Sequence, residues 1–182
     1  DLAKTKLIRN GEKVAPTFSK EEMERRNARL RRHMAEQGIE AVLFTSYHNI
    51  NYYSDFLFTY FGRSYGMVVT ADDTCTITAN IDAGMPWRTS YGENIVYTDW
   101  QRDNFYYALQ QVLAQRGITS PKRLGIEDDT VPLLTREKLQ DAFPDATLVD
   151  LAVRLVEGVD PEEPAGDGRG DLPQEELRAE RA

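Results

Sequence analysis

Residues 39–79 read IEAVLFTSYHNINYYSDFLFTYFGRSYGMVVTADDTCTITA, in which two apolar runs frame a segment dense in aromatic rings. The first run, IEAVLFT at 39–45, is short, apolar and bounded by a glycine and polar residues, which predicts a buried strand. The second run, YGMVVTADDTCTITA at 65–79, predicts a hairpin with its turn at 71–73, where two aspartates favour a turn. The segment SYHNINYYSDF at 46–56 is expected to be a loop beyond the carboxyl end of the first strand.

A helix is predicted immediately before this region, at residues 20–37. Ser19 followed by Glu22 forms a capping box, and Gly38 supplies a stop. An apolar stripe at helical spacing consists of Met23, Leu30 and Met34.

Beyond the hairpin, strands and helices are expected to alternate. Strands are predicted at 94–98, 122–127 and 146–151, and a helix at about 102–115. A second helix is expected to be capped by Thr135. This alternation, interrupted by one hairpin, predicts an α/β fold with a mixed β-sheet flanked by helices.

The net charge of −8 is concentrated at one end of the chain. Residues 157–182 hold nine acidic and three basic residues, a net of −6, together with scattered Pro and Gly and no aromatic residue. We therefore expect one domain at 1–156 and an acidic Pro/Gly-rich tail or linker at 157–182. The body is nearly neutral, and this balance argues against nucleic acid or an anionic membrane as a partner, since both require a clustered positive face.

The sequence has no apolar run near the roughly 20 residues that span a bilayer, and its first residues carry charges throughout. These features predict a cytoplasmic protein. Cys75 is the single cysteine and is expected to be a small apolar residue in a strand, without a disulfide framework. No spacing of Cys, His or carboxylates predicts a metal or other cofactor.

No complete catalytic constellation is evident, so no catalytic residue is predicted. His48 is the one histidine in the aromatic segment, and hydrogen bonding within that segment is its expected role. Phe61 and Arg63 are more suggestive, because a guanidinium can bind both oxygens of a small carboxylate while a neighbouring ring packs on the rest of the ligand. The competing interpretation is that Arg63 is a solvated hairpin residue and that the tyrosines belong to the core.

Several of these segments resemble one family closely. FTSYHNINYYSDF at 44–56, FGR at 61–63 and NIVYTDWQRDN at 94–104 are similar to the N-terminal domain of creatinases, in the creatinase/aminopeptidase P/prolidase superfamily. The resemblance covers about residues 5–156. The run YTDWQRDN at 97–104 is typical of creatinases rather than of the peptidases.

The resemblance implies a ribonuclease H-like α/β domain and the hydrolysis of creatine to sarcosine and urea, without a metal, in a homodimer. It implies that catalysis belongs to a C-terminal pita-bread domain that this chain lacks, and that Phe61 and Arg63 reach the partner subunit's site and bind substrate there. The chain would then be inactive alone. Two alternatives remain: a non-catalytic guanidino-acid-binding or dimerisation module, and a domain from a peptidase relative, which YTDWQRDN disfavours.

Overall fold

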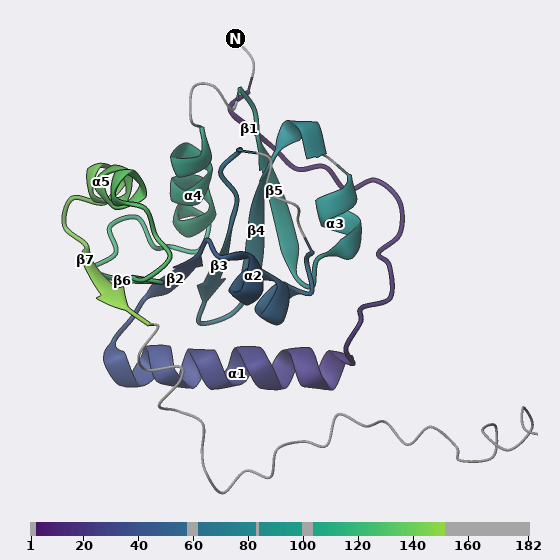
Figure 1. Ribbon diagram of the computed structural model, residues 1–182, viewed down its shortest axis with the longest axis horizontal. Coiled ribbons are helices and arrows are strands. Elements are labelled where there is room, and N and C mark those ends of the chain that lie inside the picture. Colours follow the sequence, from purple (N-terminus) through teal and green to yellow (C-terminus); the bar gives the residue numbers. More distant parts are fainter. Residues whose placement is uncertain (1–2, 58–61, 83, 100–103, 152–182) are drawn as a thin grey trace, which may run out of the picture.

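The computed structural model describes residues 3–57, 62–82, 84–99 and 104–151 (Figure 1). The strands in these ranges are β1 (Thr5–Lys6), β2 (Ala41–Phe44), β3 (Gly66–Thr70), β4 (Thr74–Ala79), β5 (Glu93–Tyr97), β6 (Arg123–Ile126) and β7 (Thr147–Asp150). The helices are α1 (Lys20–Gln37), α2 (Tyr47–Ser54), α3 (Met85–Thr89), α4 (Phe105–Ala114) and α5 (Leu133–Ala142), with a short 3-10 helix, η1, at Asn80–Asp82.

The described strands form one mixed sheet in the order β1-β5-β4-β3-β2-β6-β7. Strand β3 is antiparallel to both of its neighbours, β2 and β4, which confirms the predicted hairpin. The pairs β4–β5, β2–β6 and β6–β7 are parallel, and the connections between the paired strands carry helices. The predicted α/β class, a mixed sheet flanked by helices, is therefore confirmed.

Helices cover both faces of the sheet, so its inner strands, β2 to β6, are buried on two sides (Figure 1). Successive residues of β2 alternate between two apolar clusters, as the pleat of a strand requires: Ala41 and Leu43 face one cluster, Val42 and Phe44 the other. Side chains of α4 and α5 complete the first cluster, and side chains of α1 and α2 complete the second. This double burial explains why β2 reads as a continuous apolar run.

Helix α1 begins and ends where its sequence predicts. The Oγ of Ser19 accepts a hydrogen bond of 3.2 Å from the backbone N–H of Glu22, which caps the first turn. Gly38 follows the last turn with φ +62°, a left-handed conformation that glycine adopts without steric cost. The predicted apolar stripe is buried and consists of Met23, Leu30 and Met34.

The segment after β2, predicted as a loop, is largely the helix α2. Ser46 is its N-cap and accepts from the backbone N–H of Asn49 at 3.2 Å, while Asp55 closes the helix with φ +58°. Ile50 and Tyr53 point into the core shared with α1. A local cap and tertiary burial together stabilise a helix that its aromatic and β-branched composition does not favour.

Three further expectations are corrected or limited. Thr135 lies inside the first turn of α5 and does not cap it, since Pro132 occupies the N-cap position in an extended conformation. Strand β1, which the sequence did not predict, pairs with β5 through only two residues. The predicted helix start at 102 and the tail at 157–182 lie outside the described residues, so the domain boundary at 156 stays a prediction.

Candidate functional site

Arg63 and Asp82 meet at one end of the β3–β4 hairpin. Arg63 lies shortly before β3, and Asp82 lies in η1 directly after β4. Because β3 and β4 are antiparallel, with Gly66 opposite Ile77, the start of one strand and the end of the other share an edge of the sheet. The Nη2 of Arg63 approaches the two carboxylate oxygens of Asp82 at 3.0 and 3.3 Å.

This ion pair is largely removed from water. The side chains of Arg63 and Asp82 are each only 15% exposed. The interpretation of Arg63 as a solvated hairpin residue is therefore wrong: a carboxylate in the same domain holds its guanidinium. Phe61, the other predicted substrate-binding residue, lies outside the described residues, and its role stays a prediction.

A second contact fixes the backbone next to Arg63. Tyr97 ends β5, in register with Ala79 of the parallel strand β4, and its hydroxyl donates a 2.6 Å hydrogen bond to the carbonyl of Ser64. Burial raises the pKa of Tyr97 to about 12, so its hydroxyl remains a donor at neutral pH. The carboxyl ends of β4 and β5 thus hold both the side chain and the backbone of this short segment.

The aromatic residues of the opening stretch divide between core and surface. Tyr53 is buried and stacks on Phe44, with 4.9 Å between ring centroids, as the core interpretation predicts. Tyr47 and Tyr52 are partly exposed on α2. His48 makes an edge-on contact with the ring of Tyr47, and its side chain makes no hydrogen bond to the described residues, contrary to its expected role.

Exposed apolar side chains lie close to the Arg63–Asp82 pair in sequence. Ile81, immediately before Asp82, is 69% exposed, and Met85 begins α3 with 45% exposed. Leu57 is also exposed and lines a cavity of about 180 Å³ together with Met85. We call these three exposed side chains, Leu57, Ile81 and Met85, the apolar rim.

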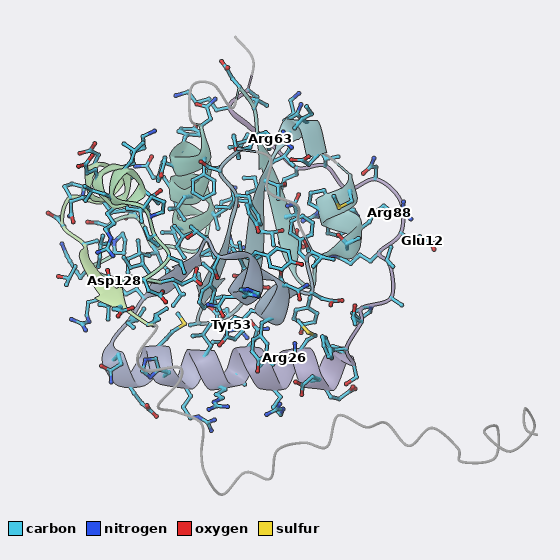
Figure 2. The ribbon with its side chains drawn as sticks, in the orientation of Figure 1. Glu12, Arg26, Tyr53, Arg63, Arg88 and Asp128 are labelled. Carbon is cyan, nitrogen blue, oxygen red and sulfur yellow. The ribbon has the colours of Figure 1, made fainter. Side chains whose placement is uncertain are left out.

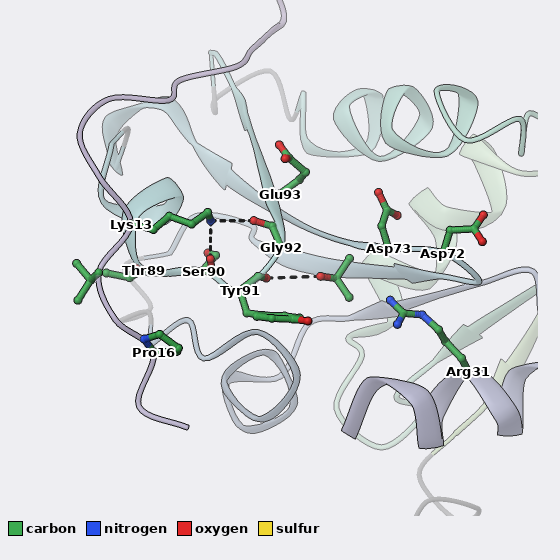
Figure 3. Close-up of a pocket in the computed structure, with 12 residues that line it drawn as sticks. Lys13, Pro16, Arg31, Asp72, Asp73, Thr89, Ser90, Tyr91, Gly92 and Glu93 are labelled. Carbon is green, nitrogen blue, oxygen red and sulfur yellow. Dashed lines mark hydrogen bonds between the residues drawn. The ribbon is translucent and has the colours of Figure 1, made fainter. Parts of the chain in front are cut away.

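A cavity of about 450 Å³ lies at the opposite end of the hairpin, beside the turn between β3 and β4 (Figure 3). Lys13 closes one side of it by donating to the carbonyls of Trp87, Ser90 and Gly92 at 3.0, 2.7 and 2.9 Å. These bonds hold the segment before α1 against the β5 edge. They give Lys13 a structural role. Arg63, labelled near the top of Figure 2, does not line this cavity.

Other candidate chemistry is limited in the described residues. They contain no group of three or more His, Cys, Asp or Glu side chains that could hold a metal ion. Cys75 is buried in β4, as predicted, and burial raises the pKa of its thiol to about 12, so it is not a thiolate at neutral pH. No described helix is long and apolar enough to cross a membrane.

A family model described as the Creatinase/Prolidase N-terminal domain matches residues 26–159. The chain belongs to this family. Among curated proteins, the chain is 63% identical over 153 residues to the creatinase of Bacillus sp. (strain B-0618). That match covers 84% of this chain and 37% of the Bacillus creatinase, so the chain spans little more than a third of that relative's length.

Solved structures with the same fold include N-terminal domains of the creatinase/prolidase family from streptococcal peptidases. A proline dipeptidase structure from Streptococcus pneumoniae has a TM-score of 0.64 at 17% identity and covers 72% of this chain and 94% of that one. The N-terminal domain of an X-Pro dipeptidase from Streptococcus pyogenes also scores 0.64, at 18% identity, and covers 74% of this chain and 98% of that one. These similarities establish the fold and leave the ligand open.

Asp82 and Tyr97 are the two site residues that sequence reasoning missed. The hairpin prediction already implied that the residues before Gly66 and after Ala79 lie close together, and this was the available signal for Asp82. Nothing local to Tyr97 indicates its contact with Ser64, because that contact depends on the parallel pairing of β5 with β4.

Proposed function

We propose that this chain is the N-terminal domain of a creatinase-like hydrolase that converts creatine and water to sarcosine and urea. The match covers 37% of the Bacillus creatinase. In this proposal the catalytic groups lie in the larger part of the protein, which corresponds to the rest of that relative. Phe61 and Arg63 contribute substrate binding across a cytoplasmic homodimer, with creatine or a similar small guanidino acid as ligand. The 63% identity to a creatinase supports this substrate class over a peptide.

The observation that carries the proposal is the placement of Arg63 at the carboxyl ends of the parallel strands β4 and β5. Ligands of open α/β sheets commonly bind beyond these strand ends. A guanidinium is the side chain best suited to a small carboxylate, because its planar donors match the two oxygens. The carboxylate of Asp82 already accepts from Nη2 of Arg63 at 3.0 Å, so this environment tolerates a guanidinium–carboxylate pair.

The apolar rim supports the dimer part of the proposal. Leu57, Ile81 and Met85 are exposed apolar side chains that lie close in sequence to Arg63 or Asp82, and a subunit interface would bury them. A partner subunit or a catalytic domain that covered this rim would remove water from the site and strengthen a guanidinium–carboxylate contact.

A second candidate is a non-catalytic guanidino-acid-binding or dimerisation module. The change to an acidic, Pro- and Gly-rich composition after residue 156 favours it, because that composition is typical of linkers and tails. The intact mass of the natural product separates the two candidates. A mass of 20.8 kDa supports the module, and a much heavier chain supports the hydrolase.

Arg63→Lys in the full-length protein tests the role of the guanidinium. The variant keeps the charge but loses the planar fork, so KM for creatine should rise and kcat/KM should fall by about ten- to a hundredfold. Urea release from 1-ethyl-1-methylguanidine, which lacks the carboxylate, should change far less. Arg32→Lys, at an exposed position on α1, is the matched control and should behave as wild type with both substrates.

Equal losses on creatine and on the carboxylate-free analogue would show that Arg63 does not bind the substrate carboxylate. Kinetics within about twofold of wild type for both substrates would remove Arg63 from the site altogether.

A further inference from the structure

We infer that Asp82 is a positioning residue for Arg63: it sets the place and orientation in which the guanidinium meets a ligand carboxylate. The inference rests on the proposed function and adds a residue that the resemblance to creatinases did not supply. It concerns a contact within one domain, so the isolated chain can test part of it.

The ion pair has the geometry that positioning requires. The contacts of 3.0 Å to Oδ1 and 3.3 Å to Oδ2 both come from the same nitrogen, Nη2 of Arg63. The Nη2 end of the guanidinium is therefore held against Asp82, which fixes where the end of the side chain lies. With both side chains 15% exposed, the attraction acts in a less polar medium than water and is screened less than at an open surface.

The supports on either side of the pair are rigid. Asp82 ends the 3-10 helix that directly follows β4, a strand buried along its whole length. Ser64, next to Arg63, is held by the hydroxyl of Tyr97, a side chain only 1% exposed. Two anchors on adjacent residues leave the Arg63 side chain little freedom, and such preorganisation lowers the entropy lost when a ligand binds.

The negative charge of Asp82 also has an opposing effect, since it competes with the ligand carboxylate for the same guanidinium. Substitutions separate the two effects. Asp82→Ala removes the anchor and the charge, whereas Asp82→Asn removes the charge but keeps an oxygen that can accept from Nη2. Positioning predicts a larger loss for Ala than for Asn, and competition predicts a gain for both.

Kinetics of the full-length protein supply the first test. Asp82→Ala should raise KM for creatine on the order of ten- to a hundredfold, with a smaller change in kcat, and Asp82→Asn should lie between it and wild type. The loss should be small with 1-ethyl-1-methylguanidine and should nearly vanish when Arg63 is already Ala. Glu93→Ala, which removes the carboxylate of the exposed Arg9 pair at the other end of β5, is the control and should leave KM unchanged.

The mobility of the Arg63 side chain supplies a test that does not depend on activity. In the 182-residue chain, the NMR order parameter of the Arg63 Nε–Hε bond should fall in Asp82→Ala and less so in Asp82→Asn. An unchanged order parameter in Asp82→Ala overturns the inference, as do equal kinetic losses on both substrates or losses that add fully to those of Arg63→Ala.

The two proposals can fail separately. If Arg63→Ala leaves KM for creatine unchanged, the proposed carboxylate contact is wrong, and the order parameter alone decides whether Asp82 positions Arg63. If Arg63→Ala raises KM but Asp82→Ala does not, the proposed function stands and the positioning role is rejected.

Discussion

The carboxylate of Glu127 accepts a hydrogen bond of 2.6 Å from the side-chain amide of Asn49, which lies 78 residues earlier in the chain. Glu127 directly follows β6, and Asn49 lies in the first turn of α2, which follows β2. Since β2 and β6 are parallel neighbours, their carboxyl ends meet at one edge of the sheet. The same carboxylate accepts from the backbone N–H groups of Thr45 and Ser46 at 2.7 and 2.9 Å.

Glu127→Ala should destabilise the domain by about 3 kcal/mol, because Glu127 is only 2% exposed and the substitution leaves buried donors without an acceptor. Glu127→Gln should cost about 1 kcal/mol, since one amide oxygen can still accept from both backbone N–H groups. Urea denaturation of the 182-residue chain measures both values. Asp129→Asn, an exposed acid nearby, is the control and should stay within about 0.5 kcal/mol of wild type.

An Ala variant as stable as the control would mean that water or a rearranged α2 replaces the Glu127 carboxylate. The helix would then depend on its Ser46 cap and its buried face alone.

Glu22 should make the stability of the domain depend on pH in the acid range. Hydrogen bonds from Arg25 and then Arg26 lower its pKa to about 2, against an unfolded value near 4.3. A lowered carboxyl pKa contributes stability that is present above the unfolded value and is lost as the pH falls toward the folded one. Because 28% of the Glu22 side chain remains exposed, solvent screening limits this contribution to about 1 kcal/mol.

Chemical denaturation between pH 7 and pH 2 measures this effect. The free energy of unfolding of wild type should fall more steeply than that of Glu22→Gln from about pH 4.5 downward. Parallel curves for the two proteins across this range would show that the Arg25 and Arg26 contacts do not favour the charged carboxylate.

Deleting residues 160–182 should leave the thermal midpoint of the chain nearly unchanged. The tail has no aromatic residue and a net negative charge, so it offers little apolar area to offset the entropy of ordering it. Differential scanning calorimetry of the two chains compares them directly. A fall of more than a few degrees would indicate that the tail packs on the domain.

The 182-residue chain alone should not release urea from creatine. Its one histidine in the aromatic segment, His48, is exposed on α2 and contacts only Tyr47 among the described rings, so it lacks the fixed geometry of a general base. Urea is measured with a coupled assay against a buffer blank. Turnover above the blank that disappears in His48→Ala would contradict this expectation.

Local patterns in the sequence determined several of the regular elements of this protein. The apolar run of β2, the aspartate turn between β3 and β4, and the Ser19 cap and Gly38 stop of α1 each act within a few residues of the chain. Such short-range signals can be recognised without a structure. They were enough to predict the mixed α/β sheet. The residues of segments such as YTDWQRDN were enough to indicate the resemblance to creatinases.

Tertiary structure decided the helix α2 and the surroundings of Arg63. Helix α2 depends on the carboxylate of Glu127, which follows β6 much later in the chain. For this reason the prediction of a loop was wrong. Arg63 pairs with Asp82 through the register of β3 on β4, and the Tyr97 contact needs the parallel register of β5 as well. The attraction between two charges depends on the distance between them in space. That distance is known only once the pairing register of the strands is known.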